Sequence, residues 1–170
     1  MGGHAVRFHG VERGTVDFDF VVDPQDWDSL PNRLDELSLF DGPPHEGPSW
    51  RPEDFRRFVV GRLPDGSEER VELWRRNHLL DRFEQLSQRR AEGEYGGGRI
   101  AALSLEDLMR SKRTEREQDW DDLRLLEEVA DERSLAGCDA QHREEALSKL
   151  RSRRGFERGK HPIQRAPRGR

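Results

Sequence analysis

Cysteine is nearly absent from this chain, since Cys138 is the only one among 170 residues and no internal disulfide can form. No run of 18 or more apolar residues occurs, and the start lacks a signal-like pattern, so neither a membrane span nor secretion is expected. Hydrophobic residues make up 32% of the chain and charged residues 38%, which predicts a domain with a small core. These absences favour a cytoplasmic, reducing setting with no membrane partner.

The net charge of −5 conceals an uneven distribution. Residues 151–170 carry eight Lys or Arg and a single acid, Glu157, which leaves −12 for residues 1–150. We expect residues 1–150 to form one domain and residues 151–170 to form a basic, disordered tail. The tail could contact RNA or the acidic body of its own domain, or it could serve solubility alone.

The pattern of apolar residues predicts an α+β domain with a mixed sheet. A glycine turn and a short helix ending at Gly10 are expected at the start. Strands are predicted at residues 14–22, 55–63, 70–74 and 99–103, the middle two forming a hairpin. Helices are predicted at residues 27–37, 79–91 and 119–131, and loops at 41–54 and 93–98. Ser104-Leu105-Glu106-Asp107 resembles a capping box that opens a further helix.

Two aspartates, Asp17 and Asp19, stand two residues apart in the apolar, β-branched run from 14 to 22. Side chains of a strand alternate between its two faces, so both carboxylates point the same way. Neighbouring carboxylates repel unless a positive charge lies between them, and Mg²⁺ prefers oxygen ligands. The pair therefore predicts a divalent cation site, the alternative being the wet face of an edge strand.

Three further features extend this hypothesis. Glu72 lies on a neighbouring strand and can bring a third carboxylate to the same place, although it could also be an exposed hairpin residue. Gly2 and Gly3 precede the aspartate strand and would let backbone N–H groups approach a phosphate, unless they are only a flexible terminus. The charged run 112–122 contains Lys112 and Arg116, which could meet a triphosphate or simply form a solvated helix face.

Taken in order, these motifs resemble the nucleotidyltransferase superfamily (DNA polymerase β-like). The resemblance is closest to its small prokaryotic branch of abortive-infection and toxin–antitoxin proteins, and it covers residues 2–130. The matching residues are Gly2, Gly3, Ala5, His9 and Gly10; Arg13, Thr15, Asp17 and Asp19; Glu72; and Leu105–Leu108, Lys112, Arg116, Asp119 and Trp120. Members of the family usually have a helix and a strand before the double glycine, and here that N-terminal helix and strand are missing. The third carboxylate is often Asp, whereas here it is Glu72.

The resemblance implies a nucleotidyltransferase-like mixed sheet flanked by helices, and transfer of a nucleoside monophosphate from an NTP to a hydroxyl on RNA or a protein. Asp17, Asp19 and Glu72 would be the catalytic residues and would hold two Mg²⁺ or Mn²⁺ ions. Gly2, Gly3, Lys112 and Arg116 would bind the nucleotide. A toxin–antitoxin or phage-defence system, with a cognate toxin or antitoxin as partner, is the implied setting.

The sequence allows more than one role for Asp119 and more than one function for the protein. Asp119 could orient Lys112 or Arg116, or it could be a surface acid, and His9 is expected to brace the turn at Gly10 rather than act as a base. A non-catalytic nucleotidyltransferase-like protein, regulating or binding a partner, is the alternative function. An acidic interaction domain with a basic arm is a third hypothesis.

Overall fold

The computed structural model describes residues 1–30, 32–33, 52–136, 144–145 and 148. The chain forms, in order, α1 (Gly2–Phe8), β1 (Asp17–Val21), the 3₁₀ helix η1 (Pro52–Asp54), β2 (Phe55–Arg62), β3 (Glu68–Trp74), α3 (Phe83–Gln88), β4 (Ala91–Tyr95), β5 (Gly98–Ala102), α4 (Leu105–Ser111) and α5 (Glu117–Ser134). The predicted basic tail, together with Leu34 and Leu37 of the expected second helix, lies outside the described residues. No helix in the described part of the chain is long and apolar enough to cross a membrane.

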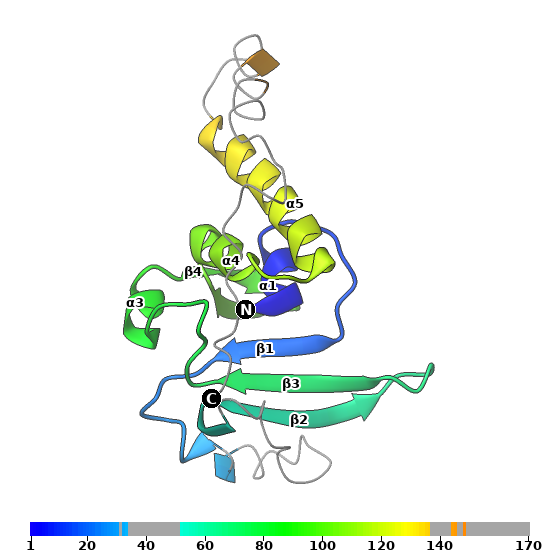
Figure 1. The fold of residues 1–170 in the computed structure, drawn as a ribbon, viewed down its shortest axis with the longest axis vertical. Coiled ribbons are helices and arrows are strands. Elements are labelled where there is room, and N and C mark those ends of the chain that lie inside the picture. The colour runs from blue at the N-terminus through cyan, green and yellow to red at the C-terminus, as the bar shows by residue number, and fades with distance from the viewer. Residues whose placement is uncertain (31, 34–51, 137–143, 146–147, 149–170) are drawn as a thin grey trace.

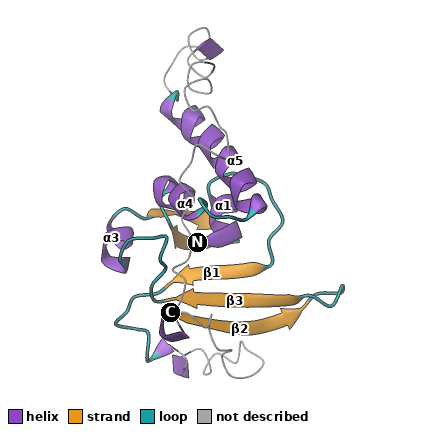
Figure 2. Ribbon diagram, viewed as in Figure 1, coloured by secondary structure: helices purple, strands orange, loops and turns teal. Residues whose placement is uncertain are grey.

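A mixed three-stranded sheet has the order β1-β3-β2. β1 runs parallel to β3, and β2 pairs with β3 as an antiparallel hairpin whose turn contains Gly66 at φ +83°. Figures 1 and 2 show β1 as the edge strand that faces α1, with α4 and α5 on the far side of that helix. The predicted α+β class with a mixed sheet flanked by helices is confirmed.

One face of the sheet is apolar and carries its own small core. Trp27, Phe58 and Leu73 are buried together there, with Val71 packed against them. Phe58 and Val71 are paired across β2 and β3, so they share a face, and Leu73 follows on the same side. Arg56 covers Trp27, with its guanidinium 4.4 Å from the ring centre. The opposite face is thereby left for polar side chains.

A second core joins the helices. Its buried members are Ala5, Val6, Val11, Leu86, Leu103, Leu108 and Leu126. Leu126 belongs to the face of α5 on which Trp120 and Leu123 are also buried, as the 3.6-residue spacing predicts. Ser104 is the N-cap of α4, and its Oγ accepts the Asp107 N–H at 3.1 Å, so the capping interaction expected at Ser104 is present.

The region from 79 to 98 differs from the prediction. The helix expected at 79–91 is limited to Phe83–Gln88, and residues 91–102 form the antiparallel hairpin β4–β5. The glycines of the loop predicted at 93–98 form the turn of this hairpin, in which Gly96 and Gly97 have φ values of +60° and +83°. Two successive positive φ angles are those of a two-residue turn that matches the twist of paired strands.

His9 ties the helical layer together from a buried position. Its Nε2–H donates to the Leu103 carbonyl at 2.8 Å, because a carbonyl oxygen can only accept, and Arg133 donates to the His9 carbonyl at 3.1 Å. Burial lowers the pKa of His9 and the Arg133 charge acts in the same direction, although the Leu103 hydrogen bond opposes them. His9 thus braces the chain at Gly10, as expected.

A lowered histidine pKa makes the fold sensitive to acid. The folded-state pKa lies below the ordinary value of about 6.5, so the contribution of neutral His9 is present above that pH and is lost as the pH falls. We expect Tm to fall less between neutral pH and about pH 5 in His9→Gln, which keeps an N–H donor, than in the wild type. Equal Tm changes in thermal melts would contradict this account.

Candidate functional site

The three predicted carboxylates lie in neighbouring positions on the polar face of the sheet. Asp17 and Asp19 alternate with Phe18 along β1, and Asp19 is paired directly with Glu72 of β3. Directly paired residues on adjacent strands share a face, and their Cβ atoms are about 5 Å apart. The structure therefore places Asp17, Asp19 and Glu72 together, as the sequence predicts.

These acids line a cavity of about 500 Å³ between the polar face of the sheet and the helices. Gly2 and Gly3 close one side of it at the start of α1. A Cβ atom on Gly2 would lie 1.8 Å from Asp19 Oδ2, and one on Gly3 would lie 2.3 Å from Thr15 Oγ1. Gly2 also has φ +68°. The double glycine thus allows the backbone to approach the aspartate strand at a distance that a side chain would prevent.

The aspartate pair lacks a cationic side-chain partner. Asp17 Oδ1 is buried and has no hydrogen-bond partner, and no Lys or Arg in the described ranges forms an ion pair with Asp17 or Asp19. Burial raises the pKa of Asp19 to about 6. The N-terminal ammonium of Met1 and the charge of Lys112 oppose this rise, and the charges of Glu72 and Asp17 add to it. A divalent cation would relieve this shortage of positive charge.

Glu72, in contrast, already has a cationic partner. Arg57 of β2 contacts Glu72 Oε1 through Nε at 2.9 Å and Nη2 at 2.7 Å. Within the described residues, no group of three or more His, Cys, Asp or Glu side chains is arranged to hold a metal ion. Asp17 and Asp19 therefore offer two carboxylates to a cation, and carboxylate oxygens are ligands that Mg²⁺ accepts. Asp17, Asp19 and Glu72 do not form the three-carboxylate cage that the resemblance implies.

Lys112 lies at the C-terminal end of α4 and lines the cavity from the helical side. Its ammonium is buried between two acids of α5, at 2.9 Å from Asp119 Oδ1 and 2.8 Å from Asp122 Oδ2. Arg13 forms a further ion pair with Asp122, and Thr114 Oγ1 donates to Asp119 at 2.6 Å. Asp119 is therefore the acid that orients Lys112, which settles the alternative that the sequence leaves open.

Arg116 has a different position, at the rim. Its side chain is 73% exposed, lines the same cavity and approaches Asp119 at 4.0 Å. Of the two cations assigned to the nucleotide, Lys112 is fixed and largely neutralised by its aspartates. Arg116 is largely exposed to solvent.

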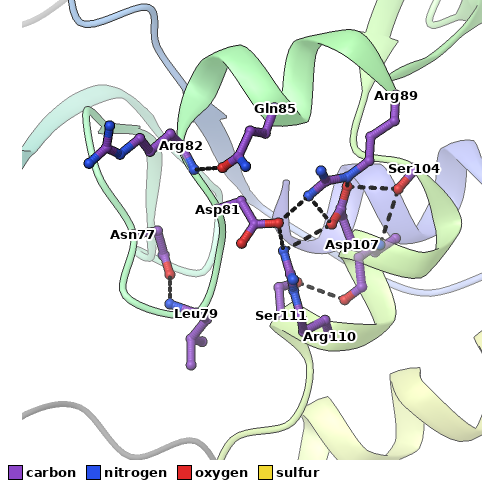
Figure 3. Close-up of polar contacts among 11 residues, drawn as sticks. Asn77, Leu79, Asp81, Arg82, Gln85, Arg89, Ser104, Asp107, Arg110 and Ser111 are labelled. Carbon is purple, nitrogen blue, oxygen red and sulfur yellow. Dashed lines mark hydrogen bonds and ion pairs between the residues drawn. The ribbon is translucent and has the colours of Figure 1, made fainter.

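A polar cluster, drawn in Figure 3, connects the segment 77–82 with α3 and α4. Arg89 binds the buried Asp107 with both Nε and Nη2, and Arg110 bonds to both Asp107 and Asp81. The hydrogen bonds from Arg110 and Arg89 lower the pKa of Asp81. Asn77, whose Oδ1 accepts the Leu79 N–H at 2.9 Å, lines the cavity from this tethered segment. The cluster thus holds one wall of the cavity against α4.

Sequence reasoning missed several residues of the cavity. These are Arg57, Arg70 and Trp74 on the sheet, and Asn77 and Thr114 between elements. Arg57 could have been found by extending the hairpin register from Glu72 across to β2. Asp122, which binds Lys112 from behind, carried a signal as well, because it stands three residues after Asp119 on one helix face.

Comparison with known proteins found a similar solved structure but no family. No protein-family model matches the chain, and no curated protein matches it. A crystal structure of an antigenic nucleotidyltransferase-like protein from Paracoccidioides brasiliensis is similar, with 21% sequence identity and a TM-score of 0.45. The match covers 91% of this chain and 79% of that chain. A likeness of this degree assigns no role to any residue.

The contact between Gly2 and Asp19 gives a first prediction for the site. Gly2→Ala would push a methyl group against the Asp19 carboxylate and adds the cost of a positive φ, about 1–2 kcal/mol. We expect Tm to fall by roughly 4 °C or more in thermal melts. Gly14→Ala is the matched control, because a Cβ there meets nothing within 4 Å. Equal Tm values for the two variants would contradict the close approach.

The buried position of Lys112 gives a second prediction. Lys112→Met would leave Asp119 and Asp122 short of a counter-charge, and breaking a buried ion pair costs about 3–5 kcal/mol. Urea unfolding should show that loss. Arg116→Met, at an exposed position on the same cavity, should change the free energy of unfolding by less than about 0.5 kcal/mol. A similar small change for both variants would show that Lys112 is not held as described.

Proposed function

We propose that this protein is a metal-dependent nucleotidyltransferase that moves a nucleoside monophosphate from an NTP to a hydroxyl group on RNA or a protein. One observation carries the proposal. Two aspartates without a cationic side-chain partner share a cavity with Glu72, beside a backbone that approaches them at Gly2 and Gly3. Such a site fits a divalent cation with a triphosphate.

Asp17 and Asp19 would hold Mg²⁺ or Mn²⁺, which would neutralise the triphosphate oxygens and lower the pKa of the attacking hydroxyl. Gly2 and Gly3 would let the backbone lie against the phosphates without a steric clash. Arg116, exposed at the rim, would contact the departing pyrophosphate as a mobile cation. Lys112, held in place by Asp119 and Asp122, would form a fixed wall of the site on the side of the helices.

In this scheme Glu72 has a role that differs from the one the resemblance implies. Its carboxylate is bound to Arg57, so it would orient that arginine and add negative charge beside Asp19. It would not complete a second metal site in the arrangement described. A toxin–antitoxin or phage-defence setting, with a cognate partner, belongs to the proposal through the sequence resemblance alone.

A second candidate function rests on the same ion pair. Because Glu72 is bound to Arg57, it would not help to hold a second metal ion. The site could then bind an NTP with one metal ion, and the protein could regulate a partner without transferring the nucleotide. Metal-dependent NTP binding by calorimetry, without any transfer of label, would identify this non-catalytic protein.

The proposal is tested by incubating the purified full chain with each α-³²P-labelled NTP, Mg²⁺ or Mn²⁺, total RNA and cell lysate. We expect label on RNA or on a protein band, reduced at least about a hundredfold in the double variant Asp17→Asn/Asp19→Asn, because single groups in such sites contribute factors of this size. Asp28→Asn, at an exposed carboxylate, is the matched control and should leave transfer unchanged.

Two results would overturn the proposed activity. One is undiminished labelling by the double aspartate variant. The other is the absence of label with every NTP and both metals while the protein remains folded by circular dichroism. Either would remove the aspartate pair from the chemistry that we assign to it.

A further inference from the structure

The polar face of the sheet continues beyond the three carboxylates, toward β2. Strand register places Arg70 opposite Asp17 and Arg57 opposite Glu72, and Trp74 follows Glu72 by two residues on the same face of β3. Arg57, Arg70 and Trp74 all line the cavity. Nothing in the proposed nucleotide site uses them as ligands.

Arg57 is held in a defined orientation. Two of its nitrogens bond to a single Glu72 oxygen, and its guanidinium lies 5.3 Å from the ring centre of Phe55. The side chain is nevertheless 39% exposed. A guanidinium has five N–H donors in a fixed fork, so the donors not directed at Glu72 remain available for an oxyanion.

Arg70, on β3, is likewise held by a glutamate and partly exposed. Its Nε and Nη2 bond to Glu68 Oε2 at 3.3 and 3.2 Å, and its side chain is 37% exposed. Arg62 shares Glu68 at 3.0 Å from the next strand. Three arginines of this face thus share the two carboxylates Glu72 and Glu68, and the side chains of Arg57 and Arg70 still reach solvent.

Trp74 supplies an aromatic surface beside these arginines. Its ring packs edge-on against Phe55 at 4.5 Å, and its Nε1–H is buried with no hydrogen-bond partner. Proteins that bind single-stranded nucleic acids combine a cationic track for the backbone with aromatic rings on which bases stack. Arg57, Arg70 and Trp74 provide both parts within one cavity.

We propose that the acceptor is a single-stranded nucleic acid that lies on the β2–β3 side of the cavity. Its phosphates contact Arg57 and Arg70, and a base stacks on Trp74. This inference rests on the proposed function and assigns its acceptor. The aspartates then separate two cationic sides, with Lys112 and Arg116 on the side of the helices and the two arginines on the sheet. A hydroxyl on a protein brings no regular series of phosphates, so it would not use this row.

The test measures binding without catalysis. Fluorescence anisotropy follows a short fluorescein-labelled single-stranded RNA, or the matching DNA, titrated with the full chain in the absence of metal and NTP. We expect Arg57→Ala/Arg70→Ala to raise Kd at least about tenfold, and to reduce the slope of log K against log salt by about 1.4, or about 0.7 for each lost phosphate contact. Every variant retains residues 151–170, so their contribution is constant.

Two further variants separate stacking from charge. Trp74→Leu should raise Kd about fivefold or more, with the salt slope unchanged. Arg99→Ala is the matched control, because Arg99 pairs with Glu92 on the β4–β5 hairpin outside the cavity, and its Kd should stay within about twofold of the wild type. If the alanine double variant fails to fold, Arg57→Lys/Arg70→Lys keeps the charges but not the fork, and an increase in Kd is still expected.

The outcomes distinguish this inference from the proposed activity. Wild-type Kd values for the arginine and tryptophan variants, or transfer of label only to a protein, would overturn the nucleic-acid acceptor while the transfer reaction stands. Binding that depends on Arg57 and Arg70, in a protein that labels nothing, would support the nucleic-acid surface and overturn the reaction. Comparison of the Kd values for RNA and for DNA identifies which of the two nucleic acids the surface binds.

Discussion

Repulsion among carboxylates is the constraint on which the arrangement of this cavity depends. The parallel pairing of β1 with β3 brings Asp17, Asp19 and Glu72 to one face, at distances where like charges cost several kcal/mol at an effective dielectric constant of about 20. Cations from several elements reduce this repulsion. Arg57 approaches from β2, and Lys112 from the end of α4. The compensation is uneven, because Glu72 receives an ion pair and the aspartates receive none within the described residues.

The buried cluster around Lys112 shows how the helical side answers the same constraint. A single lysine between two aspartates would leave an excess of negative charge, and Arg13, from the connection between α1 and β1, restores the balance at Asp122. The cluster therefore links the segment before the aspartate strand to α4 and α5. Removing these charges from water costs free energy that offsets much of their mutual attraction, so the cluster adds little to the free energy of unfolding. Loss of one member would nevertheless leave a buried charge without a partner.

Much of the fold was predictable because it depends on short-range patterns. Alternation in β1 placed Asp17 and Asp19 on one face, and the turn at 64–67 fixed the β2–β3 hairpin. The hairpin at 91–102 was missed because Ala91–Tyr95 contains two glutamates and a glycine, which have low strand propensity, and only pairing with β5 makes it a strand.

The site was predictable to the extent that its residues are close in sequence or follow from strand register. The partnership of Lys112 with Asp119 was weighed as an alternative, but its burial was not foreseen, because it depends on how α4 meets α5. Arg57 was missed for another reason. Arginine on a strand next to polar neighbours gives no signal of its own, and its meaning appears only when the register sets it opposite Glu72.

Glu72 decides how the two halves of the cavity are connected. A glutamate side chain is longer than an aspartate by one methylene, and here it reaches across to β2, where both bonding nitrogens of Arg57 meet one of its oxygens. Glu72 thus fixes an arginine at the sheet side of the cavity. The length of the Glu72 side chain therefore lets it bind Arg57, and this ion pair places a cation on the surface beside Asp17 and Asp19.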